Sequence, residues 1–435
     1  MSETDSEGPH ESVDSSFMLV SIQHDTIHEE MSRRFSDLNN YNHLDRMPQD
    51  LGMQDPKACR LEIDLNPPLY HDFEMEKRNK KKKSRRRRRR KGRNKKNNTS
   101  EDDEDSDGAD TSSYYLDIEQ SITSLCSNTD NNNSTTGYVL WKTTIMFIAW
   151  VLYEEASKPL RNGMEVTLLR NDSWSDNSDL ETSDYDFSRM FVPRLFNTKT
   201  AGYYGNTDNN KNNNKAIASI IELGSGISGI LPVVLGNHVD NYICTDQKGI
   251  LSKLQSNIKN NLKQLNKREI ISKSLNINYD NGEATSKDKK QQEINEAADI
   301  ADDKTNKRNT QKRDKQTINL EVLPLDWETF KNAADYPEFV RINNSNTNPN
   351  SVVYMLAMDV IYNDYLITPF LETVDKLRTF FLKKTRHVRI IVGVHLRNYN
   401  VIVAFLEKAL VHFGLSVYLI DDPMLKASIY NFFII

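Results

Sequence analysis

The sequence predicts an α/β fold in which a doubly wound, mostly parallel sheet of seven strands has helices on both faces. From residue 216 onward, apolar runs typical of buried strands alternate with helical segments. A glycine-rich loop joins the first of these strands to the first helix. The last two strands are separated by only DDPMLKA, which is too short for a parallel crossover. We therefore expect the last strand to be antiparallel.

The elements follow one another regularly along the chain. A strand is expected at 114–122 and a helix at 139–156, ahead of the alternating part. The seven strands of the sheet are predicted at 216–223, 239–246, 318–325, 351–358, 387–395, 415–420 and 428–435, with helices at 230–236, 248–265, 365–382 and 401–412. A parallel sheet with one reversed strand is typical of class I methyltransferases, whereas a plain dinucleotide-binding domain would lack the reversed strand.

Composition divides the 435 residues into three parts. We predict an N-terminal extension at 1–76, partly ordered with a strand near 61–65, and a disordered linker at 77–113. The linker is a basic run followed by an acidic cluster, and such blocks repel themselves and bury too little apolar surface to fold. The main domain is predicted at 114–435, with low-complexity insertions near 163–215 and 278–316.

The charge of the chain is unevenly distributed. Residues 77–96 contain 16 Lys or Arg in 20 positions, and without them the net charge of −5 becomes −21. The basic run has two interpretations that the sequence leaves open. It contacts ribosomal RNA or a nuclear import receptor, or it is a solvated linker with no dedicated partner.

Several classes of protein are excluded or disfavoured. The three cysteines have no paired spacing, and the nine histidines form no HExxH-type pair, so we expect neither a disulfide scaffold nor a metal site. The longest apolar stretch, 139–153, contains Lys142 and is too short to span a membrane. The first residues are polar and acidic, unlike a signal or transit peptide. We expect a cytoplasmic protein, with nuclear import through the basic run as an alternative.

The loop GSGISG at 224–229 is the first candidate for a binding site. Glycines after a strand let the backbone turn tightly and approach a ligand closely. Twenty residues after Gly226, Asp246 ends the next strand, where a carboxylate can accept hydrogen bonds from both hydroxyls of a ribose. Together they predict a nucleoside-containing cofactor. By themselves they leave NAD, S-adenosyl-L-methionine and a turn that binds nothing as alternatives.

Other residues favour S-adenosyl-L-methionine. Glu222 directly precedes the glycine loop, an acidic position common in methyltransferases. Asp359 and Tyr362 follow the fourth strand of the sheet, beside the switch point where chemistry is expected. Trp327 follows the third strand, where its ring would lie near an adenine, and Trp141 lies in the segment that opens the N-terminal helix. Both tryptophans also have a simpler interpretation as core residues.

Five motifs in order, GYVLW, ELGSGISG, TDQKG, LDW and MDVIY, resemble the methyltransferase-like family 21 group of protein lysine methyltransferases. VGVHLR and the stretch QDLGMQD…LEI before the basic run are similar to the same pattern. The resemblance covers roughly residues 50–435. The two insertions depart from the family pattern in length, so the resemblance says less about the substrate than about the cofactor. It implies a Rossmann-like class I methyltransferase fold and methyl transfer from S-adenosyl-L-methionine to a protein lysine.

Carried onto this chain, the resemblance implies that Asp359 and Tyr362 face the incoming lysine as catalytic residues. Asp359 would hold the ammonium group and fix its direction, and Tyr362 would add an aromatic face or a hydroxyl. The strand-end carboxylate of Asp359 has no evident partner in the sequence. The implied cofactor-binding residues are Trp141, Glu222, Gly224, Ser225, Gly226, Asp246, Trp327 and Met358.

The same resemblance implies that the substrate is a lysine of a large-subunit (60S) ribosomal protein, namely the protein of the L-one stalk. The acidic body of the chain suits a basic protein partner better than bare RNA. Three rival functions remain: an NAD-dependent oxidoreductase, a protein that binds RNA through the basic run, and an RNA methyltransferase. The last is disfavoured because Asp-Val-Ile-Tyr at 359–362 lacks the prolines typical of sites that methylate base amino groups.

Overall fold

A computed structural model describes thirteen parts of the chain, namely residues 18–40, 52–65, 113–122, 136–153, 168–169, 217–265, 268–279, 316–346, 348, 351–385, 387–422, 425 and 429–435. Nearly all of the linker predicted at 77–113, and nearly all of the two predicted insertions, lie outside the described residues. The division of the chain into three parts therefore stays a prediction.

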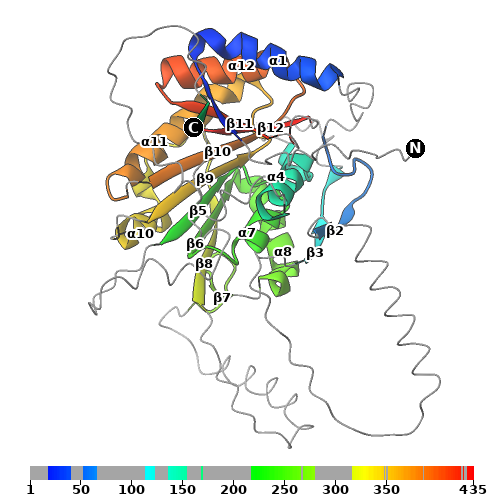
Figure 1. Cartoon of the computed structure of the whole chain (residues 1–435). Helices are drawn as coiled ribbons and strands as arrows, with labels where there is room; N and C mark the ends of the chain where they lie inside the picture. The colour runs from blue at the N-terminus through cyan, green and yellow to red at the C-terminus, as the bar shows by residue number, and fades with distance from the viewer. Residues whose placement is uncertain are drawn as a thin grey trace, which may run out of the picture.

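Parallel strands form the centre of the structure (Figure 1). β5 (Ala218–Leu223) lies between β9 (Val352–Met358) and β6 (Asn241–Asp246), and all three are parallel. β10 (His387–His395) continues the sheet beyond β9, and β8 (Gln316–Pro324) continues it beyond β6. Every residue of β5 and β9 is buried, which explains their mostly apolar sequences. The chain changes direction across the sheet at β5 and β9, so the carboxyl ends of these strands border the switch point.

The predicted reversal of the last strand is confirmed. β12 (Tyr430–Ile434) pairs antiparallel with β10 and with β11 (Val417–Asp421), and so lies between two strands that run in the other direction. In the part of the chain that the structure describes, the sheet has ten strands instead of the predicted seven. β1 (Met18–Ile22) and β4 (Leu168–Leu169) extend it beyond β11, and β7 (Arg268–Ile271) extends it beyond β8. These three short outer strands lack the long apolar runs on which the prediction relied.

Helices cover both faces of the sheet, as predicted. Side chains of β5 alternate between two cores, with Ile220 in one and Ile221 in the other. The first core packs under α4 (Lys142–Tyr153), α7 (Ile230–Leu235) and α8 (Lys248–Asn260).

The second core packs under four helices on the opposite face (Figure 1). They are α1 (Ile27–Asn40), α10 (Pro337–Ser345), α11 (Asp364–Leu382) and α12 (Tyr399–Glu407). α12 continues as a π-helical turn at Lys408–His412, and short 3-10 turns lie at His24–Thr26, Thr136–Tyr138, Leu262–Gln264 and Ala333–Asp335. Within the described residues, no helix is long and apolar enough to cross a membrane.

A separate two-stranded sheet is attached to α8. β2 (Arg60–Leu65) pairs antiparallel with β3 (Tyr114–Glu119), across the linker in the sequence. The open edge of β3 is covered by Asn257 of α8 and by Asn261, which directly follows that helix. Their carboxamides exchange hydrogen bonds of 2.8–2.9 Å with the backbone of Glu119 and Asp117, respectively. Asn257 also donates to the carbonyl of Ile227 in the glycine loop, at 2.7 Å. The small sheet is thus tied to the loop that borders the switch point.

Candidate active site

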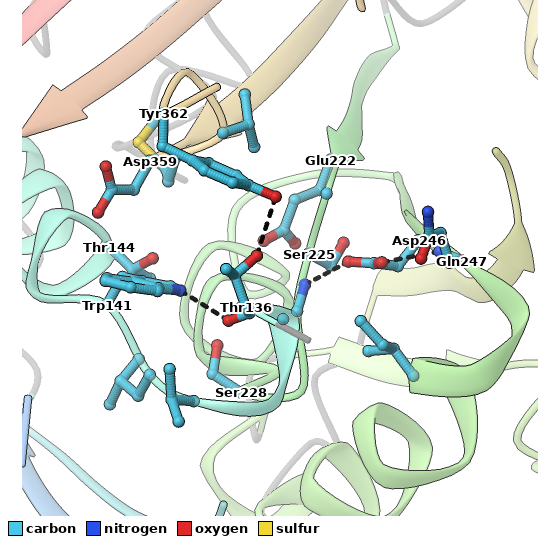
Figure 2. Close-up of a pocket in the computed structure, with 18 of the residues that line it drawn as sticks. Thr136, Trp141, Thr144, Glu222, Ser225, Ser228, Asp246, Gln247, Asp359 and Tyr362 are labelled. Atoms are coloured by element: carbon cyan, nitrogen blue, oxygen red, sulfur yellow. Dashed lines mark hydrogen bonds between the residues drawn. The ribbon is translucent and has the colours of Figure 1, made fainter. Parts of the chain in front are cut away.

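A cavity lies at the carboxyl edge of the parallel strands, and its lining contains all ten of the predicted site residues. In Figure 2, Asp359 and Tyr362 lie toward one end of it and Asp246 and Gln247 toward the other, with Glu222 and Ser225 between them. The tertiary structure therefore brings the ten residues together around one space, from five separate segments of the chain: Trp141; Glu222, Gly224, Ser225 and Gly226; Asp246; Trp327; and Met358, Asp359 and Tyr362.

The glycine loop depends on backbone conformations that favour glycine. Gly224 and Gly226 have φ angles of 72° and 58°, in the left-handed region. A Cβ on Gly224 would also lie 2.8 Å from Cγ1 of Val360, and one on Gly226 would lie 3.2 Å from the carbonyl oxygen of Gly137. The backbone N–H of Ile227 donates to that same carbonyl at 3.0 Å. The loop is therefore in direct contact with the segment that leads to Trp141.

Asp246 is held by this loop. Its Oδ2 accepts a hydrogen bond of 2.7 Å from the backbone N–H of Gly226, and its Oδ1 accepts one of 2.7 Å from that of Gln247. Burial raises the pKa of Asp246 to about 6, and the two backbone donors oppose the rise. An ionised carboxylate has about four acceptor positions. Asp246 therefore keeps acceptor capacity for hydroxyl groups in the cavity.

Glu222 is a buried acid in the middle of the cavity. The hydroxyl of Tyr242 donates to its Oε2 at 2.9 Å. Burial raises the pKa of Glu222 to about 8, although hydrogen bonds from Tyr242 and Ser225 lower it. Glu222 is therefore mostly protonated at neutral pH in the free protein.

We expect the protonation of Glu222 to make folding stability depend on pH. Because its folded pKa lies above the unfolded value, the folded state binds the extra proton, and stability is lost as pH rises toward 8. Between pH 6 and pH 8 this group should lower the free energy of unfolding by about 2 kcal/mol. Glu222→Gln keeps an acceptor for Tyr242 and cannot ionise, so it should remove that part of the decline. Urea unfolding of both proteins at the two pH values measures the difference; equal declines would contradict the assignment.

Asp359 lies at the end of β9 in an unusual conformation. Its φ angle is 60°, and its backbone N–H donates to the carbonyl of Gly393 at 2.7 Å. Its side chain is fully buried and forms an ion pair with Arg397, which follows β10. Burial raises the pKa of Asp359, and the charge of Arg397 opposes the rise. The sequence-based view that this carboxylate has no evident partner is therefore wrong, because its partner comes from the neighbouring strand.

Tyr362 and Trp141 both hydrogen-bond to Thr136. The Thr136 hydroxyl donates to the Tyr362 hydroxyl oxygen at 3.0 Å, and Nε1 of Trp141 donates to the Thr136 carbonyl at 3.0 Å (Figure 2). The guanidinium of Arg397 lies 4.8 Å from the centre of the Trp141 ring. These contacts fix the Trp141 ring beside the end of the cavity that contains Asp359.

Two other residues of the lining, Trp327 and Met358, also have contacts in the core. Trp327 lines the cavity and packs edge-on against Phe370, with ring centres 5.1 Å apart. Met358 lines the cavity while 6% exposed, within the core of β9. Both side chains therefore belong to the core and border the cavity at the same time.

Sequence reasoning missed several residues of the site. Thr136 directly precedes the motif GYVLW, and Gln247 lies within TDQKG. Arg397 lies within VGVHLR, as the first basic residue after a strand of the sheet. Its position after β10, next to β9, was the available signal, because parallel neighbours end at the same edge. The other missed lining residues are mostly apolar: Gly137, Val139, Leu140, Thr144, Ser228, Ile250, Leu325, Val360 and Leu366.

The two ends of the cavity suit different chemical groups. The Asp246 end offers carboxylate acceptors for hydroxyls, and the Asp359 end offers an ion-paired carboxylate, a tyrosine hydroxyl and an indole ring. Across the described residues, no group of three or more His, Cys, Asp or Glu is arranged to hold a metal ion. The arrangement fits a group transfer between two bound organic molecules, one at each end.

Comparisons with known proteins identify relatives along nearly the whole chain. No family model matches the sequence. A Candida glabrata protein named Ribosomal lysine N-methyltransferase 5 is 35% identical over 429 residues, covering 96% of this chain and 99% of the relative. A Saccharomyces cerevisiae protein of the same name is 37% identical over 426 residues, with the same coverage of both chains.

These relatives agree with the predicted methyltransferase and not with the oxidoreductase alternative. Their identity and coverage, together with the sheet and its reversed last strand, establish a class I methyltransferase fold for this chain. The chain is an enzyme of the protein-lysine methyltransferase class and belongs to the ribosomal lysine N-methyltransferase 5 family.

Proposed function

We propose that this protein transfers a methyl group from S-adenosyl-L-methionine to a lysine of a large-subunit ribosomal protein, that of the L-one stalk. The observation that carries the proposal is the convergence of all ten predicted residues on one cavity, with Asp246 and Asp359 toward opposite ends. The printed names of the relatives support a lysine acceptor and a ribosomal substrate. The stalk protein rests on the family resemblance alone.

The residues of the cavity fit the cofactor. Gly224 and Gly226 have no side chains where they line the cavity, so a ligand can approach the backbone of the loop. Asp246 would accept hydrogen bonds from the ribose hydroxyls, and Glu222 would lie near the charged amino-acid end. When bound, S-adenosyl-L-methionine supplies a methyl group on a positively charged sulfur. The surrounding side chains would exclude water and hold the acceptor in line, which accounts for much of the acceleration in such displacements.

Asp359 and Tyr362 would orient the acceptor. A lysine amine must lose its proton before it attacks, yet free lysine has a pKa of about 10.4. A buried environment lowers that value because it disfavours the ammonium form. The hydroxyl of Tyr362 and the carboxylate of Asp359 would then fix the direction of the amine.

The acceptor can be identified directly by methyl labelling. The full-length protein is incubated with labelled S-adenosyl-L-methionine and either purified stalk protein or the remaining large-subunit proteins, and the products are mapped by mass spectrometry. We expect label on one lysine of the stalk protein. Label on another ribosomal protein would show that the proposed substrate is wrong, and label on RNA would favour the RNA-methylating alternative.

We further propose that the protein is cytoplasmic and that the basic run at 77–96 contacts ribosomal RNA. The run lies outside the described residues, and its 16 positive charges support a contact with phosphates. In the labelling experiment, a chain without residues 77–96 should bind the cofactor normally. It should methylate intact large subunits more slowly at low salt, with a smaller difference at high salt. Equal rates at all salt concentrations would contradict this role.

A further inference from the structure

Arg397 does not line the cavity, but it connects two residues that do. It follows β10, and its guanidinium forms the ion pair with Asp359 at the end of β9. The same group lies 4.8 Å from the ring centre of Trp141, which comes from the segment before α4. A planar guanidinium can pair with a carboxylate at its edge and stack on a ring with its face. One side chain therefore joins three separate segments at the acceptor end of the cavity.

The surroundings of Asp359 make this partner important. The Asp359 side chain has no exposed surface, whereas that of Arg397 is 20% exposed. Arg397 is the charged group that acts on Asp359; the other contacts are the Thr143 hydroxyl at the start of α4 and the backbone of His395 in β10. The ring of His395 packs against Tyr430. A buried carboxylate without Arg397 would be left with no compensating charge.

We propose that Arg397 is a positioning residue that neutralises Asp359 while its own guanidinium is held by Trp141, so that the cavity offers an incoming amine an oriented but charge-compensated carboxylate. A lone carboxylate would stabilise the ammonium form of a lysine, which cannot attack a methyl group. The Asp359–Arg397 pair has no net charge, so it can accept a hydrogen bond from the amine with less stabilisation of its protonated form. The reasoning about the amine rests on the proposed function.

Two substitutions separate the charge of Arg397 from its shape. Arg397→Met keeps an apolar chain near Trp141 and removes the charge, whereas Arg397→Lys keeps the charge and loses the planar contact. With S-adenosyl-L-methionine and large-subunit ribosomal protein as acceptor, kcat should rise with pH in each protein. The midpoint for Arg397→Met should lie about one pH unit or more above that of the native protein. Arg397→Lys should keep the native midpoint. A purely structural role would lower kcat without moving the midpoint, and that result would overturn the proposal.

Stability gives a second readout that does not depend on activity. Arg397→Met should unfold at a lower temperature than the native protein, and adding Asp359→Asn should restore part of the loss, because the unpaired carboxylate is gone. Arg60→Met is the matched control, since Arg60 pairs with Asp117 on the small sheet and is 66% exposed. It should change neither the midpoint nor the stability appreciably.

The two readouts distinguish failure of this inference from failure of the proposed function. If the native protein methylates no ribosomal protein but the stability of the double variant exceeds that of Arg397→Met, the ion pair stands and the proposed substrate is wrong. If methylation occurs but Asp359→Asn restores no stability to Arg397→Met, Arg397 does not compensate Asp359 and the inference is wrong.

Discussion

Asp359→Asn is expected to lower kcat by at least about 100-fold, because it removes the carboxylate that accepts a hydrogen bond from the acceptor amine and orients it. Asparagine is the informative substitution at this position. Asp359 has a φ angle of 60°, which asparagine tolerates and alanine does not. Affinity for S-adenosyl-L-methionine should change little, because the lost contact is to the acceptor and the transition state. Single-turnover transfer and calorimetric titration of the cofactor measure the two quantities separately.

Asp117→Asn is a suitable control for this substitution. Asp117 also pairs with an arginine, but it lies on β3 and does not line the cavity. The kcat of the Asp117→Asn variant should equal that of the native protein. If Asp359→Asn folds normally and retains kcat within a small factor of the native value, Asp359 has no role in orienting the acceptor.

Asp246→Ala is expected to weaken S-adenosyl-L-methionine binding by about 10- to 100-fold, the usual cost of losing hydrogen bonds to a charged acceptor. The substitution also removes the acceptor for the backbone N–H groups of Gly226 and Gln247, so part of the loss will come from the loop. Burial raises the pKa of Asp246 to about 6. The native affinity should therefore be complete above that pH and fall as the carboxylate is protonated below it. Calorimetric titrations from pH 5 to pH 8 test both expectations.

Asp240 provides a matched control on the same strand. Asp240 directly precedes β6, whereas Asp246 is the last residue of that strand. The Asp240 carboxylate accepts a hydrogen bond from the backbone N–H of Ala218 and forms an ion pair with Arg268. Asp240→Ala should lower stability and leave cofactor affinity unchanged, because Asp240 lies at the opposite end of the strand from the cavity. Equal losses of affinity in the two variants would mean that the effect of Asp246→Ala is one of folding.

The central sheet was predictable because burial on both faces leaves a direct trace in the sequence. β5 and β9 are apolar at nearly every position, and both are buried throughout. The short connection before the last strand likewise excluded a parallel crossover, and β12 is antiparallel. The outer strands β1, β4 and β7 were missed for the converse reason. They are short and gain their place from pairing with strands far away in sequence.

For the site, the sequence by itself determined which strand ends carry the glycine loop, Asp246 and Asp359, because parallel strands present their carboxyl ends at one edge. Only the tertiary structure decided the electrostatic state of those groups. The pairing of Asp359 with Arg397 and the protonation of Glu222 depend on burial and on the charges and donors supplied by neighbouring segments. Desolvation and pairing are properties of three-dimensional surroundings, and residues 38 positions apart in the chain become partners only when β9 and β10 lie side by side.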